Sequence, residues 1–136
     1  MDAIDSKILA ELQKDARISY TDLAKKLNLS DVAIKKRVDK LIDDGIIKSF
    51  SIELNYKKLG KNVQAFLFLR VIPEEAAQIE NSIKKIENTV RINKLLGQHD
   101  FFVEVVCNDL EELKKITEEK ISTSKGVIEI RTYVVI

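Results

Sequence analysis

The side chains best suited to chemistry are cations gathered in one short segment: Lys35, Lys36, Arg37 and Lys40. Cations that share one face of a helix attract the phosphates of nucleic acid. An α-helix also fits the major groove of B-DNA, where its first residues reach the base edges. This segment begins with Asp31, which suits a cytosine amino group, and Val32, which suits a thymine methyl group. The alternative is a solvated face whose lysines are balanced by nearby aspartates.

Two capped helices are predicted to position these side chains. Ser19 and Ser30 are the expected N-caps, the turn 28–30 separates the two helices, and Gly45 ends the second one. Short helix, tight turn and second helix form a helix-turn-helix pattern. The free N–H groups at the start of the first helix suit a phosphate. The predicted DNA-contacting residues are Ser19, Tyr20, Thr21, Ser30, Asp31, Val32, Lys35, Lys36, Arg37 and Lys40.

Composition offers little to catalysis or to metal binding. The only histidine is His99 and the only cysteine is Cys107, which excludes an internal disulfide and a cysteine-rich zinc site. The four glycines lie far apart, so no glycine-rich loop cradles a phosphate. We therefore predict a protein that is not an enzyme and has no cofactor. We expect His99 to be an exposed turn residue and Cys107 to lie in the core.

Membrane and export signals are not found in the sequence. No apolar run approaches the length of a membrane span, and the first residues, which are acidic, do not read as a signal peptide. The expected compartment is therefore the cytoplasm. Charge is divided unevenly, since residues 1–62 carry 13 basic and 10 acidic side chains and residues 63–136 carry 10 and 12. The excess is weak, but it agrees with DNA binding by the first part.

The remaining chain predicts a second domain. From residue 50 to residue 55 the apolar period changes to two, which predicts a strand, and residues 55–62 resemble a hinge. Residues 63–136 read as β-α-β-β-α-β, the ferredoxin-like order. The strands are apolar on both faces, as in Phe66 and Phe68 against Leu67 and Leu69. Because helices cover only one face of such a sheet, we expect the other face to bury itself against a second subunit.

An ordered set of residues makes the whole chain resemble one known family. The set comprises Asp5, Ile8-Leu9, Leu12-Gln13, Asp15-Ala16-Arg17, Ser19, Leu23-Ala24, Leu27, Leu29-Ser30, Arg37-Val38, Leu41, Gly45-Ile46-Ile47, Gly97-Gln98-His99-Asp100, Gly126-Val127 and Arg131-Thr132-Tyr133-Val134-Val135. In this set the chain resembles the Lrp/AsnC transcription regulators, also called feast/famine regulators. The resemblance implies an α+β fold, with an N-terminal winged helix-turn-helix at 1–48, a linker strand and hinge at 49–62, and a C-terminal ferredoxin-like βαββαβ (RAM) domain at 63–136 that senses an effector.

The resemblance also implies partners. Family members bind pseudo-palindromic double-stranded DNA, form dimers through facing sheets, pair their linker strands and often assemble into octamers. Amino acids modulate them by binding between dimers. The residues that this implies for the effector are Gly97, Gln98, His99, Asp100 and Thr132. Asp100 suits the ligand ammonium, Gly97 admits backbone N–H groups to the carboxylate, and Thr132 offers a hydroxyl.

Three alternatives remain open at this point. The turn 97–100 also suits a plain hairpin, with Gly97 at positive φ and Asp100 bonded to its own backbone. Effector-binding relatives often carry a hydroxyl residue where this chain has Ile130. This difference leaves open a DNA-binding regulator that responds to no effector. Sirohaem decarboxylases look like the same family, and on that template His99, Arg131 and Tyr133 would contact a tetrapyrrole.

Overall fold

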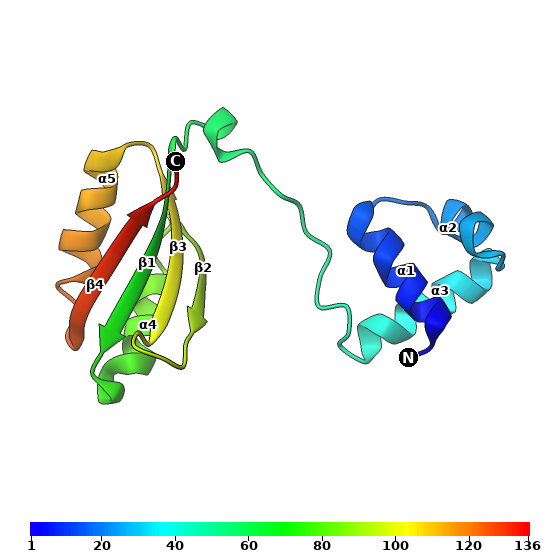
Figure 1. The fold of residues 1–136 in the computed structure, drawn as a ribbon, viewed down its shortest axis with the longest axis horizontal. Helices are drawn as coiled ribbons and strands as arrows, with labels where there is room; N and C mark the ends of the chain where they lie inside the picture. Colours follow the sequence, from blue (N-terminus) through cyan, green and yellow to red (C-terminus); the bar gives the residue numbers. More distant parts are fainter. The chain divides into compact units, whose positions relative to one another are not determined.

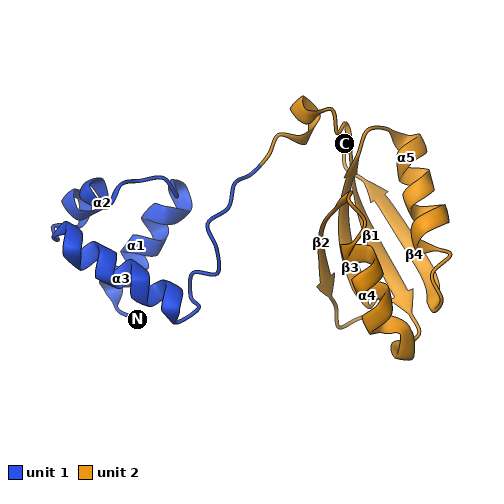
Figure 2. Cartoon of the chain, turned by 180° about the vertical axis from the view of Figure 1, so that it is seen from behind, with its two compact units in different colours: residues 1–53 blue, residues 54–136 orange.

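Two units with separate hydrophobic cores make up the chain. The computed structural model describes residues 1–136, which divide into Met1–Glu53 and Leu54–Ile136 (Figure 2). The first unit is helical, and the second combines one sheet with helices (Figure 1). None of the helices has both the length and the apolar character that a membrane crossing requires.

The first unit contains the predicted helix-turn-helix. Its helices are α1 (Ala3–Lys14), α2 (Tyr20–Leu27) and α3 (Asp31–Asp43). The Ser19 hydroxyl accepts a hydrogen bond from the Asp22 N–H at 3.0 Å, and the Ser30 hydroxyl accepts one from the Ala33 N–H at 3.1 Å. Asn28 ends α2 in the left-handed conformation, with φ of 55°, which asparagine tolerates better than most residues. Both predicted N-caps are therefore confirmed.

The core of this unit is built from one apolar stripe on each helix. Its buried members are Ile8, Leu12, Leu23, Ala24, Ile34, Val38 and Leu41. Their spacing of three and four residues places them on one side of each helix, because α-helices have 3.6 residues per turn. Burial of Ile34, Val38 and Leu41 leaves the opposite face of α3 exposed.

The strand expected at residues 50–55 is not formed. Residues 48–55 carry no regular hydrogen-bonded structure, and a single 3₁₀ turn, η1 (Tyr56–Leu59), follows them. A strand needs a neighbour to receive its N–H and C=O groups, and no other segment of this chain pairs with it. Phe50 and Ile52 accordingly remain 52% and 80% exposed.

The second unit has the predicted ferredoxin-like order. Its elements are β1 (Val63–Val71), α4 (Ala76–Lys84) after a short 3₁₀ turn, β2 (Thr89–Lys94), β3 (Phe101–Cys107), α5 (Leu110–Lys115), which continues as a π-helical turn to Ile121, and β4 (Val127–Val134). The strands form one antiparallel sheet in the order β2-β3-β1-β4. Buried side chains from β1 and β3 pack against Ile79 and Ile83 of α4 and against Leu113, Ile116 and Ile121, and Cys107 lies in this core as expected.

The alternation of side chains along β4 is interrupted at one point. A bulge between Arg70 and Val71 shifts the pairing of β1 with β4. Because a shift of one residue moves a side chain to the other face, Val127 packs against the core with Ile130, although strict alternation from Ile130 would put Ile128 there. Ile128 is instead 56% exposed.

Gly126 precedes β4 in a place where any side chain would clash with Glu75. Its φ is +96°, and an added Cβ would lie 2.5 Å from the Cβ of Glu75. We expect Gly126→Ala to lower the free energy of unfolding of this unit by about 3 kcal/mol, from left-handed strain plus overpacking. Gly60→Ala is the control for strain alone, since its φ is +82° with no atom within 4 Å. Urea titrations giving equal losses for both variants would contradict the assigned clash.

Candidate functional site

The exposed face of α3 carries five of the ten residues predicted to contact DNA. Val32 is 77% exposed, and Asp31, Lys35, Lys36 and Lys40 are also exposed. Val32, Lys36 and Lys40 are spaced by four residues, so they form a stripe along the helix. The sequence reading of this face is thereby confirmed for exposure.

The cations of α3 differ in what they already bind. The Lys35 ammonium lies 2.6 Å from Asp39 Oδ2, one turn further along the helix, and this hydrogen bond raises the pKa of Lys35. Lys36 and Lys40 make no ion pair or side-chain hydrogen bond. Of the α3 cations, these two are therefore free to meet a phosphate without breaking an internal contact.

Arg37 is held inside the unit. Its Nη1 donates to Asp2 Oδ2 at 2.8 Å and to Asp5 Oδ1 at 3.0 Å, and its side chain is 30% exposed. The hydrogen bond from Arg37 lowers the pKa of Asp2 to about 2, with the Asp5 backbone N–H contributing. Asp2 and Asp5 also form the capping box of α1. Arg37 thus joins α3 to the start of α1, a role that its exposure pattern in the sequence did not indicate.

The starts of α2 and α3 are joined by a second contact. The Thr21 hydroxyl donates to Asp31 Oδ2 at 2.8 Å, although the two residues are ten positions apart. Tyr20, beside Thr21, is 36% exposed. Ser19 and Ser30 each use the side-chain oxygen to cap their own helix. The sequence predicts that Thr21 contacts a phosphate, but its hydroxyl donates to the Asp31 carboxylate instead.

The turn predicted for the effector is tied to the end of β1. The Asp100 N–H donates to the Leu69 carbonyl at 2.7 Å, and Asp100 Oδ2 accepts from the Val71 N–H at 2.8 Å. The turn does join the antiparallel neighbours β2 and β3 as a hairpin, but Asp100 bonds to β1 and not to its own backbone. Gly97 does not have a positive φ either, so that turn does not require glycine for its conformation. Gly97 and Gln98 are exposed.

His99 is not the exposed residue that its place in a turn suggested. Its side chain is only 18% exposed, and Nε2 lies 2.9 Å from Glu129 Oε1. Its ring centroid lies 5.8 Å from that of Phe68. Glu129 also accepts from Arg131 Nε at 2.9 Å, and the hydrogen bonds from His99 and then Arg131 lower the pKa of Glu129. Glu129 was missed by sequence reasoning because it lies 30 residues from His99.

An aromatic cluster occupies the sheet face that the helices leave open. Phe66 and Phe102 have centroids 5.3 Å apart, and Phe68 lies 5.5 Å from Phe102 and 5.8 Å from Tyr133. Arg91 lies 5.3 Å from the Phe102 centroid. In Figure 1 α4 and α5 run along the sheet, and their buried side chains pack on the face opposite to these rings. The open face is thus aromatic, with the Arg91–Glu104 ion pair beside the rings.

Thr132 does not join the turn within one chain. Its cross-strand partner is Leu67, a fully buried residue on the helix-covered face, and Ile130 on the same side packs against the core. Directly paired residues share a face of the sheet. His99 reaches Phe68 and Tyr133 on the other face. The five residues predicted for the effector therefore fall into two groups, 97–100 and Thr132.

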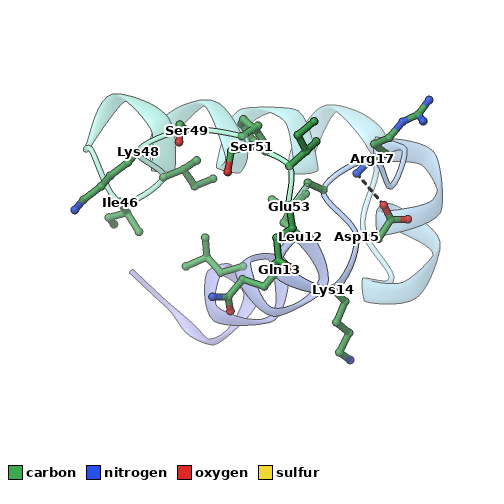
Figure 3. A pocket seen from close by; sticks show the side chains of 15 residues that line it. Leu12, Gln13, Lys14, Asp15, Arg17, Ile46, Lys48, Ser49, Ser51 and Glu53 are labelled. Atoms are coloured by element: carbon green, nitrogen blue, oxygen red, sulfur yellow. Dashed lines mark hydrogen bonds between the residues drawn. The ribbon is translucent and has the colours of Figure 1, made fainter. Parts of the chain in front are cut away.

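A hollow of about 930 Å³ lies in the first unit, outside both predicted sites. Side chains from α1 and its C-terminal connection line one side, and the segment 46–53 lines the other (Figure 3). Leu9, Leu12, Phe50 and Ile52 contribute apolar surface to it, and Gln13, Ser49 and Ser51 contribute polar groups. No cluster of histidine, cysteine or carboxylate side chains suited to a metal ion is present.

Comparison with protein families assigns both units. Residues 1–48 match the family model of winged helix-turn-helix DNA-binding domains, and residues 64–136 match that of Lrp/AsnC ligand-binding domains. An uncharacterised HTH-type transcriptional regulator of Pyrococcus horikoshii is 32% identical over 136 residues, which cover 100% of this chain and 91% of that protein. A counterpart in Pyrococcus furiosus is 33% identical over 130 residues, covering 93% and 87%.

Solved structures agree with this assignment. AsnC of Escherichia coli superposes with a TM-score of 0.88 at 26% identity, covering 99% of this chain and 91% of its own. A transcriptional regulator of Neisseria meningitidis, solved as a complex with L-methionine, has a TM-score of 0.93 at 21% identity and covers 100% and 90%. The expected fold class and domain types are thereby confirmed. The chain belongs to the Lrp/AsnC family of DNA-binding transcription regulators.

Proposed function

We propose that this regulator binds DNA through the stripe Val32, Lys36 and Lys40 and that an amino acid modulates the binding. The observation that carries the DNA contact is the division among the α3 cations. Lys36 and Lys40 have no internal partner, whereas Lys35 and Arg37 are paired with carboxylates. Cations without an internal partner release counterions from DNA at no cost in broken ion pairs.

The homodimer is part of the same proposal. The open aromatic face needs a cover of similar size, because a large exposed apolar patch is an association site. The segment 48–55 has exposed apolar side chains and backbone groups without strand partners. A second copy of the chain offers both a matching sheet face and a matching segment. We propose a dimer with these two contacts and further assembly, up to an octamer, through other surfaces.

The effector site in this proposal forms between copies of the chain. Asp100 Oδ2 accepts a hydrogen bond from the Val71 N–H, and Oδ1 remains available for a ligand ammonium. Thr132 lies on the other face of the sheet, so the two groups meet at one ligand only if a neighbouring subunit contributes one of them. The methionine complex of the Neisseria meningitidis relative supports an amino acid as the ligand class.

Asp100→Asn tests the effector site with little disturbance of the fold. The amide oxygen still accepts from the Val71 N–H, whereas alanine would leave that N–H without its partner at a cost of about 1–3 kcal/mol. We expect D100N to bind DNA as the wild type does and to lose the response to amino acids. Fluorescence anisotropy of DNA from upstream of the regulator's own gene, with and without the twenty amino acids, measures both.

Two results would contradict parts of this proposal. If calorimetry detects no amino acid bound to the wild type, the protein is a DNA-binding regulator without an effector. If D100N responds to the amino acid as the wild type does, the turn 97–100 is not the ammonium site. The tetrapyrrole alternative has less support, because His99 and Arg131 are both already bonded to Glu129. We accordingly propose a non-enzymatic role without a cofactor, in the cytoplasm with the chromosome.

A further inference from the structure

Asp31 lies at the first position of the helix that faces DNA, where a negative charge is costly beside phosphates. A carboxylate at this position is therefore expected to accept a hydrogen bond from a binding partner. The Ser30 cap satisfies the Ala33 N–H without help from Asp31, so the carboxylate is not the N-cap. The helix dipole favours an acid in this turn, but only weakly at an exposed position.

The Thr21 hydroxyl holds Asp31 in one orientation. It donates to Oδ2 at 2.8 Å from the first turn of α2 and leaves Oδ1 without a hydrogen bond. Both side chains are exposed, and Val32, the next residue, is 77% exposed. A carboxylate that is oriented beforehand loses less conformational entropy when it meets a base. The Thr21–Asp31 pair therefore presents Asp31 Oδ1 as an oriented hydrogen-bond acceptor at the N-terminal end of α3.

We infer that Asp31, positioned by Thr21, selects a cytosine in each half-site of the operator. A carboxylate only accepts hydrogen bonds, so it pairs with the amino groups of cytosine or adenine and is repelled by the acceptors of guanine and thymine. The adenine amino group lies beside the N7 acceptor, which repels the second carboxylate oxygen. The cytosine amino group lies beside a C–H group instead. This inference rests on the proposed placement of α3 in the major groove.

Binding-site selection from a pool of randomised duplexes tests this inference with four variants. We expect the wild type to enrich cytosine at one position of each half-site and to bind the other bases there about 10- to 100-fold more weakly. Asp31→Asn should move the preference at that position to adenine, because an amide pairs with adenine N6 and N7. Thr21→Val should keep the cytosine preference but reduce it several-fold, and Thr21→Ser should restore it.

Asp43→Asn is the matched control, since it removes the same charge from the other end of α3, where Asp43 is exposed and makes no side-chain hydrogen bond. We expect its selected sequences to equal those of the wild type. If D31N tightens binding equally for all sequences, Asp31 only repels phosphates and the inference is wrong. If the wild type enriches no sequence at all, the placement of α3 in the major groove is wrong together with the inference. These two results distinguish failure of the inference alone from failure of the proposed function.

Discussion

Replacement of Lys36 and Lys40 by alanine is expected to weaken DNA binding by about tenfold for each lost phosphate contact at 0.1 M salt. Both lysines are exposed on α3 and lack an internal partner. In a dimer each substitution removes a contact from both half-sites. The slope of log K against log salt should fall by about 1 per contact, so the double variant should show the largest change. Anisotropy titrations at several salt concentrations measure affinity and slope together.

Two matched variants separate this effect from loss of charge alone. Lys7→Ala removes an exposed cation from α1, and we expect it to leave the salt slope near that of the wild type. Lys35→Ala removes a cation that is paired with Asp39, so its effect on the slope should be smaller than that of Lys36→Ala. An unchanged slope in the double variant would reject the placement of this face of α3 on DNA.

Substitution of Phe68 by aspartate is expected to convert the proposed dimer into a monomer. Phe68 lies at the centre of the aromatic cluster, within 5.8 Å of the ring centroids of His99, Phe102 and Tyr133. A charge there, if buried without a partner in an interface, costs several kcal/mol, which raises the dissociation constant of the dimer at least a hundredfold by about 1.4 kcal/mol per decade. Sedimentation velocity at micromolar concentration detects the change.

Leu110→Asp is the control for this substitution. Leu110 is 62% exposed and begins α5, an element that packs on the other face of the sheet. We expect it to sediment as the wild type does. Circular dichroism should show that Phe68→Asp keeps the fold, because Phe68 is only partly buried in the single chain. A wild-type chain that sediments as a monomer at micromolar concentration would overturn the proposed face-to-face dimer.

Local pattern was sufficient for most of the fold. The capping serines Ser19 and Ser30 act on N–H groups three residues away, and the apolar stripe of α3 repeats within a few turns. Both signals lie within one element, so they are visible in the sequence before any tertiary contact is known. The order of strands and helices after residue 63 could be predicted for the same reason.

Local pattern failed where a second segment decides the outcome. The alternation at residues 50–55 predicts a strand, but strand structure needs a partner, and this chain supplies none. The bulge at Arg70 and Val71 depends on how β1 and β4 meet, so strict alternation along β4 does not by itself place Val127 in the core. The polar position of His99 in a turn likewise did not reveal its contact with Glu129.

The sequence alone determined that this protein has a helix with outward-facing cations and a sheet whose second face is also apolar. Only the tertiary structure decided which of their side chains are free to act. Arg37 forms ion pairs because α1 brings Asp2 to it across 35 residues, whereas Lys36 has no ion-pair partner. One carboxylate oxygen of Asp100 accepts a hydrogen bond from Val71 because β1 ends beside it, and the other oxygen has no partner. Hydrogen bonds and ion pairs act over a few ångströms, and residues distant in the chain come that close only through packing.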